Sequence, residues 1–272
     1  MSGTNSNVQL LTLLVDSNDE DDSEYRFLVD GKHVKYITVA PGALPRDHRT
    51  FAPVLIPMLP PFPRGDWNEG HISKEPATGQ LFFARHEKVD LDGIAHTWHP
   101  TRIDFLELKK LHRLRQNIQR VSHPLFDIPV IFKFAEFPWQ IPYFETETIA
   151  YEWIKDKDIG PKFLGHVTEA GRVIGWVMED LNGARTAEPG DLAPCQEILG
   201  KLHALGIKHG DINRFNFLVQ GDKALLIDFE AAEKCNSVEE LEAEYKLLEQ
   251  SLNDASFLGG VGPVVISEQM PE

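Results

Sequence analysis

The stretch from His209 to Val219 constrains the fold most, because it sets polar side chains directly beside an apolar strand. Asp211 and Asn216 lie on a short loop, and the next three residues, Phe-Leu-Val, are typical of a strand. A Gly-Asp pair at 221–222 signals a two-residue turn, so the following apolar run is predicted to return as a second strand that ends at Asp228. Two carboxylates and an amide at one rim of a hairpin suit a divalent cation that takes oxygen ligands, such as Mg²⁺.

The spacing His-x-Asp-x4-Asn, followed by a strand and Asp-Phe-Glu at 228–230, resembles the catalytic and metal-binding loops of the protein-kinase-like fold. Gly210 makes the loop more similar to the branch of aminoglycoside phosphotransferases, choline kinases and small atypical kinases than to regulated protein kinases. Segments 66–71 and 213–218 also resemble uncharacterised fungal kinase-like proteins. The kinase resemblance covers roughly residues 100–252. It implies an α+β, bilobal fold with a β-rich N-lobe and a reduced helical C-lobe.

The resemblance implies ATP and Mg²⁺ as cofactors and assigns roles to the polar loop. Asp228 and Asn216 would hold the metal, and Asp211 would orient the acceptor hydroxyl and take its proton. His209 is interpreted as an architectural imidazole that hydrogen-bonds backbone near Asp228, rather than as a proton-transfer group. Taken alone, each of these polar residues could equally be turn chemistry. Their combined spacing favours a catalytic site.

A lysine inside an apolar strand run marks a second part of the predicted site. Lys133 interrupts the run at 130–135, where a lysine is almost never buried without a partner. By resemblance it would bind the α and β phosphates of ATP. Glu147 is its expected partner, because this carboxylate lies in the apolar stripe of the next predicted helix. Glu145 and Glu152 lie on another face, are expected to be solvated, and remain fallback partners.

The segment Met178, Glu179, Asp180 and Leu181 resembles the kinase hinge, whose backbone amide and carbonyl bind the edge of an adenine. Read without the resemblance, it is the end of a strand followed by an interdomain loop. Both interpretations can hold together, because a hinge is also such a loop. The resemblance therefore adds these four residues to the predicted nucleotide site.

Charge and composition restrict the partners of the chain. Its net charge is −15, with 42 acidic against 27 basic residues, which argues against nonspecific binding to nucleic acid or to anionic membranes. The expected partners are a nucleotide and an unidentified hydroxyl acceptor, either a small molecule or a protein. The two cysteines, Cys195 and Cys235, form no disulfide framework. With neither a secretory signal nor a long apolar stretch, the protein is expected to be cytoplasmic or nuclear and not secreted.

Hydrophobic periodicity and turn signals predict most of the elements. Helices are expected at 144–154, at 191–206 and at 237–252, and hairpins at 25–39 and 70–84, while 103–114 is ambiguous between a helix and a strand pair. The predicted regions are an acidic flexible leader at 1–24, an N-terminal β-hairpin extension with a proline-rich connector at 25–100, the N-lobe at 101–178, the C-lobe at 179–254 and a flexible tail at 255–272.

Three departures from the kinase pattern keep a second function open. There is no glycine between Lys109 and Arg120, Glu230 replaces the glycine of Asp-Phe-Gly, and Asn213 stands where protein kinases carry a lysine, with Arg214 as a possible substitute by reach. The favoured function is an ATP- and Mg²⁺-dependent phosphotransferase. The alternative is a pseudokinase-type module that binds nucleotide or protein without turnover. A glycosidase with two catalytic carboxylates is disfavoured, because no repeated β/α pattern is present.

Overall fold

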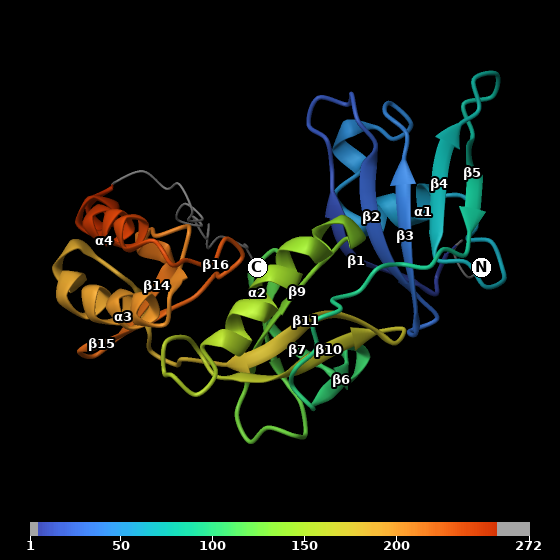
Figure 1. Cartoon of the computed structure of the whole chain (residues 1–272). Coiled ribbons are helices and arrows are strands. Elements are labelled where there is room, and N and C mark those ends of the chain that lie inside the picture. The colour runs from blue at the N-terminus through green and yellow to red at the C-terminus, as the bar shows by residue number, and fades with distance from the viewer. Residues whose placement is uncertain (1–4, 255–272) are drawn as a thin grey trace, which may run out of the picture. The chain divides into compact units, whose positions relative to one another are not determined.

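The computed structural model describes residues 5–254, which form two compact units (Figure 1). Among these residues, the first unit comprises 5–93 with two short additions, Ala135–Gln140 and Glu169–Arg172, and the second comprises the others. The flexible tail expected at 255–272 lies outside the described residues. Among the described helices, none is long and apolar enough to cross a membrane.

The first unit is built on a five-stranded sheet with the order β1-β2-β3-β4-β5. Neighbouring strands pair antiparallel, except that β3 and β4 run parallel. The connection between β3 and β4 holds α1 (Ala52–Met58) and a short 3-10 turn (Arg46–His48). Side chains such as Phe27, Leu55 and Ile72 are fully buried in one core. The strands are β1 (Val8–Leu14), β2 (Ser23–Val29), β3 (His33–Val39), β4 (Glu69–Lys74) and β5 (Leu81–Glu87).

Two expectations for this unit are wrong. Residues 8–14 of the predicted flexible leader form β1, because Val8 and its neighbours pack into the core and pair along β2. The first half of the proline-rich connector forms α1 rather than an extended segment. Proline is tolerated in the first turn of a helix, where its missing amide has no helical partner, and burial of Leu55 holds the turn against the sheet. The predicted hairpins at 25–39 and 70–84 are confirmed.

A cluster of charged and polar side chains is buried in the first unit around Glu169. Arg26 forms an ion pair with Glu169, and both side chains are only 3% exposed. Tyr36 donates its hydroxyl to Glu169 at 2.7 Å, and Arg172 donates to the same carboxylate at 2.8 Å. Arg172 also donates to the Tyr36 hydroxyl at 2.6 Å. These four residues are called the Glu169 cluster below.

The second unit has a six-stranded sheet with the order β6-β10-β11-β9-β8-β7. Strand β6 runs parallel to β10, while β9 pairs antiparallel with both β11 and β8. Helix α2 (Ile141–Trp153) follows β9, and its Phe144 and Tyr151 rings lie 5.5 and 5.8 Å from Trp176 of β11. The strands are β6 (Arg102–Asp104), β7 (Lys109–Arg115), β8 (Ile118–Ser122), β9 (Val130–Phe134), β10 (Phe163–Glu169) and β11 (Arg172–Glu179).

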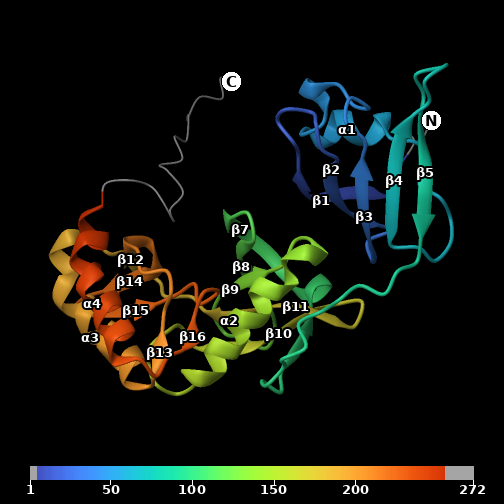
Figure 2. The same cartoon turned by 45° about the horizontal axis from the view of Figure 1, so that its top comes forward.

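The C-terminal half of this unit combines two helices with small sheets (Figure 2). Helices α3 (Leu192–Ala204) and α4 (Val238–Asn253) pack against each other. A three-stranded sheet has the order β12-β14-β15, and β13 pairs with β16. Short 3-10 turns lie in this half at Pro189–Asp191 and Arg214–Asn216, earlier in the same unit at Phe105–Glu107, and in the first unit at Pro138–Gln140. The short strands are β12 (Arg185–Thr186), β13 (Ile207–Lys208), β14 (Phe217–Gln220), β15 (Lys223–Leu226) and β16 (Glu233–Lys234).

The fold class is therefore α+β, with the β-rich N-lobe and helical C-lobe of a protein-kinase-like fold. The ambiguous segment 103–114 is strand rather than helix over most of its length. A close approach of β11 to β9 shapes the N-lobe beside Lys133. A Cβ at Gly175 would lie 2.2 Å from the Lys133 carbonyl oxygen and 2.6 Å from the Phe134 Cα, so only glycine fits there.

Candidate active site

The predicted catalytic loop, residues 209–216, leaves β13 through a glycine that no other residue can replace without a clash. Gly210 has φ +83°, and a Cβ at this position would meet the Ala231 carbonyl oxygen at 2.3 Å. His209 is fully buried beside it, and its Nε2 donates to the carbonyl of Ile227 at 3.1 Å. This is the backbone contact near Asp228 that the sequence predicts. Burial lowers the pKa of His209, which favours the neutral ring.

Glu244 of α4 anchors the backbone of this loop through hydrogen bonds. This residue is not among those predicted from the sequence. Its carboxylate accepts the backbone amides of His209 at 3.1 Å and Gly210 at 2.7 Å, and it pairs with His203 of α3 at 2.7 Å. Burial raises the pKa of Glu244, but the His203 and backbone hydrogen bonds outweigh it and leave the pKa low. An acid within the apolar stripe that includes Leu248 was the available signal, because a buried carboxylate needs partners.

Asp211 and Asn216 lie in direct contact on the loop. The Asn216 amide nitrogen donates to the Asp211 carboxylate at 2.9 Å and to its carbonyl at 2.8 Å. Asn213 also donates to the Asp211 carboxylate at 3.1 Å, and its own oxygen accepts the amide of Phe215. Because a carboxylate only accepts, the amide nitrogen of Asn216 must face Asp211. Its oxygen is then directed elsewhere and can bind a cation.

Asp228 reaches the same region from the end of β15. The amide of Ile227 donates to the Asn216 carbonyl at 3.0 Å, which fixes the residue before Asp228 against the catalytic loop. Asp228 has φ +67°, a left-handed conformation that Asp adopts more readily than most residues. Strained backbone of this kind persists where the surrounding structure holds it, and it is frequent at functional sites.

Lys133 joins Asp228 to helix α2. Its ammonium donates to Glu147 at 2.5 Å and to Asp228 at 2.7 Å. The Lys133 and Glu147 side chains are 7% and 2% exposed, whereas Asp228 is 25% exposed. Lys133, Glu147 and Asp228 are called the Lys133 cluster below. The expected partner of Lys133 is thus Glu147, and neither fallback acid contacts it.

The electrostatics of this cluster leave an excess of negative charge. Burial raises the pKa of Glu147 to about 7, against the attraction of Lys133. Burial acts the same way on Asp228, but the Lys133 ammonium holds the Asp228 pKa below its ordinary value. Burial and the Asp228 charge both raise the pKa of the nearby Glu230. One ammonium therefore faces several carboxylates, an environment that suits an additional cation.

A cavity of about 240 Å³ opens onto the Lys133 cluster. Ile118, Ile131, Leu218 and Ile227 give it apolar walls, while Lys133 and Asp228 lie at its polar part. The four predicted hinge residues, 178–181, all line it. This arrangement suits a ligand with an apolar body and a polar end that reaches Lys133 and Asp228.

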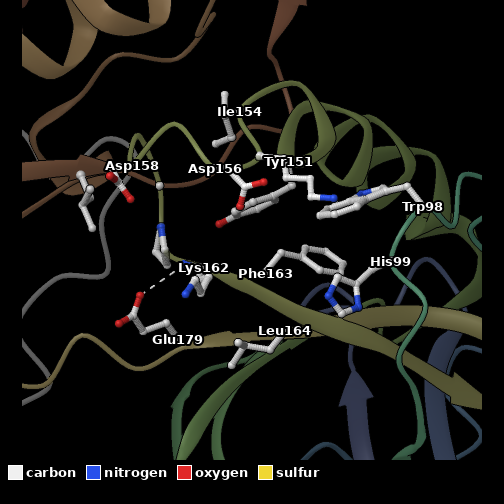
Figure 3. Close-up of a pocket in the computed structure, with 14 residues that line it drawn as sticks. Trp98, His99, Tyr151, Ile154, Asp156, Asp158, Lys162, Phe163, Leu164 and Glu179 are labelled. Carbon is white, nitrogen blue, oxygen red and sulfur yellow. Dashed lines mark hydrogen bonds between the residues drawn. The ribbon is translucent and has the colours of Figure 1, made fainter.

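The hinge is more constrained than the sequence suggests. The backbone amide of Glu179 already donates to the Lys162 carbonyl at 2.9 Å, so it is not available to an adenine. Asp180 forms an ion pair with Arg120 at 2.5 Å. The Glu179 amide is therefore excluded as a donor to a ligand, whereas the contact of Asp180 involves only its side chain. The Glu179 side chain points into a different cavity, where its carboxylate accepts the Lys162 amide at 3.4 Å (Figure 3).

That second cavity is larger, about 520 Å³, but it is not the candidate active site. It shares Tyr151, Pro161 and Glu179 with the first cavity. Trp98 and Phe163 form an aromatic wall in it (Figure 3). None of the predicted catalytic or metal-binding residues lines it, so the smaller cavity carries the site.

Arg115, at the end of β7, is a second residue that sequence reasoning missed. It lines the cavity, and its charge favours the ionised form of Asp228. The glycine-free turn after it is held by Arg113, which donates to the carbonyls of Arg115 at 3.3 Å and Gln116 at 2.9 Å. A guanidinium thus lines the cavity in the segment where the sequence lacks glycine. The signal was the basic character of 109–120, a segment without acidic residues.

Comparison with known proteins agrees with a kinase-like assignment over part of the chain. The chain is 32% identical over 102 residues to a "Probable bifunctional tRNA threonylcarbamoyladenosine biosynthesis protein" of Methanospirillum hungatei JF-1, covering 35% of this chain and 20% of the relative. It is 31% identical over 91 residues to "KEOPS complex subunit Bud32" of Pyrococcus abyssi, covering 30% of this chain and 41% of the relative. The chain thus spans less than half the length of either relative. No family model matches it. These similarities support membership of the protein-kinase-like superfamily.

Proposed function

We propose that this protein is an ATP- and Mg²⁺-dependent phosphotransferase that moves the γ-phosphate of ATP to a hydroxyl of a small molecule or a protein. One observation carries the proposal: Lys133, paired with Glu147, reaches Asp228 at 2.7 Å at a cavity that also contains the hinge. Three segments that lie far apart in the chain meet there: 133–147, the hinge at 178–181 and Asp228. Lys133 and Asp228 supply the charges that phosphoryl transfer needs, and the hinge would help to position the nucleotide.

The residues present fit a magnesium ion that completes its shell with nucleotide oxygens. Asn216 and Asp228 are the residues that would hold it, since amide and carboxylate oxygens are its preferred protein ligands. Within residues 5–254, no three His, Cys, Asp or Glu side chains cluster into a metal site of their own. When bound, the metal neutralises charge on the phosphates. Phosphate oxygens supplied by the nucleotide would therefore be part of its binding.

The remaining residues divide the work of the proposed reaction. Lys133 binds the α and β phosphates once it exchanges its contact with Asp228 for them. Glu147 keeps the Lys133 ammonium in place. Asp211 is the exposed carboxylate of the loop, and it accepts the proton of the acceptor hydroxyl. Asn216 and Asn213 hold that carboxylate in a single orientation through bonds at 2.9 and 3.1 Å.

A binding module without turnover is the second candidate, and two observations favour it. The cavity of about 240 Å³ is smaller than the ~300–1,000 Å³ usual for ligand sites. The Lys133–Asp228 ion pair closes its polar end and must open before phosphates can bind. In this case the same residues would bind nucleotide, or brace the fold, without transfer.

The names of the two relatives suggest where to look for an acceptor. One name contains "KEOPS complex subunit" and the other contains "tRNA threonylcarbamoyladenosine biosynthesis". We therefore infer that protein subunits of such an assembly are the first acceptors to test. Small hydroxyl compounds form the second group. The similar regions cover only part of each relative, so both groups belong in the screen.

Thermal unfolding with ATP, with and without Mg²⁺, tests the proposed site. Ligand at ~100 times its dissociation constant stabilises by about 2.7 kcal/mol, which raises the midpoint by roughly 5–10 °C for a chain of this size. We expect this rise to depend on Mg²⁺ and to be lost in Asp228→Asn. Asp222→Asn, an exposed substitution in the same hairpin, is the matched control and should keep it.

Asp211→Asn separates the two candidate functions. An active enzyme should keep the Mg²⁺-dependent rise in this variant but lose transfer of labelled phosphate. If the native chain transfers no phosphate although it binds Mg-ATP, the binding module is the correct reading. No rise at millimolar nucleotide in the native chain would contradict the nucleotide site itself.

A further inference from the structure

Residues 94–101 form a segment, called the strap below, that is fixed to the six-stranded sheet at both ends. The amide of Ile94 donates to the Val173 carbonyl of β11 at 2.8 Å. At the other end, the amide of His166 on β10 donates to the Thr101 carbonyl at 2.9 Å. Strand β6 follows at once and continues beside β10. The strap therefore cannot drift from the sheet that carries Lys133.

Between these anchors the strap binds one face of α2 at three positions. The Glu145 carboxylate accepts the amides of Ala95 at 2.7 Å and His96 at 2.9 Å. The Trp98 indole donates to the carbonyl of Thr148 at 2.9 Å, and His96 pairs with Glu152 at 2.7 Å. Positions 145, 148 and 152 are spaced i, i+3 and i+7, so they lie on one side of the helix. The expectation that Glu145 is merely solvated is therefore wrong.

A different face of α2 carries the site. Glu147 lies two positions after Glu145, about 200° further round the helix. Glu147 and Tyr151 are buried against the sheet and the cavity, at 1% and 2% exposure. Because a helix turns and shifts as one body, a hold on the strap side sets the position of Glu147. Any rotation that withdrew Glu147 from Lys133 would also break the bonds to the strap.

Packing leaves the strap little room to adjust. The Trp98 ring packs beside the Phe163 ring of β10 (Figure 3), at 4.6 Å between ring centroids. The Lys155 ammonium lies 5.7 Å from the Trp98 ring. At the far anchor, a Cβ on Gly165 would meet Thr101 at 2.8 Å, which shows how closely the strap approaches β10. The contacts are thus a fitted interface along the length of α2.

We propose that the strap is a built-in positioning device that holds α2 with Glu147 on Lys133, and that Glu145 and Trp98 are its principal positioning residues. Kinase-like enzymes need this lysine–glutamate pair in place for phosphoryl transfer. The catalytic consequence rests on the proposed function, whereas the hold on α2 does not. The strap also begins where the first unit ends, at residue 93. The chain therefore supplies from its own sequence a support that sets the active arrangement of this helix.

Three variants of the full chain test the strap. Glu145→Ala removes both acceptor oxygens, Glu145→Gln keeps one carbonyl oxygen, and Trp98→Phe keeps a ring but loses the donor. Glu249→Gln, an exposed acid on α4, is the matched control. The measurements, made without nucleotide, are hydrogen exchange of the α2 amides and the rate at which an acylating reagent modifies the Lys133 amine. ATP kinetics follow on the same samples.

We expect Glu145→Ala to raise both α2 exchange and Lys133 modification by about tenfold, since it removes two hydrogen bonds to a charged group. Glu145→Gln and Trp98→Phe should have smaller effects, and exchange in α3 and α4 should stay native. In the kinetics, KM for ATP should rise and kcat should fall in the same order of variants.

Native α2 exchange and native Lys133 modification in Glu145→Ala would overturn the proposal. A parallel rise in α2, α3 and α4 would also overturn it, because that pattern means general destabilisation. The two readouts need no catalysis. If the native chain transfers no phosphate, the proposed function is refuted. The role of the strap in positioning α2 is still tested by hydrogen exchange and by Lys133 modification.

Discussion

Each unit of the molecule contains a buried cluster of charges, the Glu169 cluster in the first and the Lys133 cluster in the second, and the two differ in net charge and in exposure. In the Glu169 cluster, two guanidinium groups and a phenol surround one carboxylate, and both members of its central pair are 3% exposed. In the Lys133 cluster, one ammonium faces two carboxylates, and Asp228 remains 25% exposed beside a cavity. The first cluster is complete within the protein. The second has negative charge to spare and space beside it for a ligand.

The two clusters also differ in whether their carboxylates can change protonation state when a partner is removed. Burial raises the pKa of Glu169, but Arg26 and Arg172 outweigh it and keep the pKa low, so this acid stays ionised. Arginine cannot lose its proton in a protein. Glu147, with a pKa near 7, can take one up. The Glu169 cluster therefore cannot adjust its charge when a member is lost, whereas the Lys133 cluster can do so through Glu147.

The largest loss of stability is expected from a substitution in the Glu169 cluster. Glu169→Ala leaves buried guanidinium groups without their carboxylate, and we expect the free energy of unfolding to fall by about 3–5 kcal/mol. Urea denaturation measures it. Glu87→Ala, which removes a surface pair with Arg85, should change stability by at most about 1 kcal/mol. A loss below about 1 kcal/mol in Glu169→Ala would show that the cluster is not closed in the way described.

A substitution in the Lys133 cluster should instead reduce the proposed phosphotransfer activity. Lys133→Met should lower phosphotransfer by about 10²–10³-fold, the loss typical of an electrostatic group in a transition state. At pH 6 the loss of stability should be smaller than in Glu169→Ala, because Glu147 takes up a proton. Lys157→Met, at an exposed lysine, is the matched control.

The pH dependence of Lys133→Met has a definite sign. In the unfolded chain Glu147 titrates near 4.5, whereas burial raises its folded pKa. Between these values the folded state binds more protons, so stability must fall as pH rises. We expect the variant to be less stable, relative to the native chain, at pH 9 than at pH 6. Equal losses at both pH values would contradict the proposed proton uptake.

A buried group without charge sharpens the contrast. His166 is fully buried, its Nε2 accepts the amide of His99 at 3.3 Å, and burial lowers its pKa from 6.5 to about 4. Its contribution is complete above pH 6.5 and is lost as pH falls towards 4, because the unfolded chain binds the proton first. The loss amounts to up to about 3 kcal/mol. The free energy of unfolding should be measured by urea denaturation across this pH range. In His166→Gln it should no longer fall between pH 6.5 and pH 4 by this amount, whereas in His33→Gln, a change at an exposed residue, the fall should remain.

The smallest effect, a change in KM for ATP, is expected at Arg115, which lines the cavity beside the Lys133 cluster. Arg115→Ala removes a charge that lines the cavity, and KM for ATP should rise about tenfold, equivalent to about 1.4 kcal/mol. Arg115→Lys should be intermediate. Lys110→Ala, exposed on the same hairpin, is the control. An unchanged KM in Arg115→Ala would mean that phosphates do not approach β7.

Most secondary structure, and the residues that gather at the cavity, could be predicted because their signals are local. The Asp211–Asn216 spacing, the strand–turn–strand that follows and the charge within the β9 run are each visible within a few residues. Glu147 could be chosen over Glu145 because a carboxylate in an apolar stripe requires a partner. The roles of these residues in catalysis stay predictions.

The missed features depend on contacts between distant segments. Glu244 holds the catalytic loop across 34 residues, and the strap reaches Glu145 across 50. Strand β1 is predicted as part of the leader, because its seven residues, five of them apolar, form a strand only when β2 is beside them. Helix α1 contains prolines that argue against a helix until packing of Leu55 decides otherwise. No local pattern carries this information.

The sequence by itself determined the chemistry of the candidate site and the local frame that presents it, since both follow from side-chain type and from periods of two and 3.6 residues. Tertiary structure alone decided that Lys133 meets Asp228, that Arg115 stands at the cavity and that the strap holds α2. The physical reason is that a lone ammonium, carboxylate or amide has many possible partners along a chain. Only burial in a particular fold removes water as the competing partner and selects one of them.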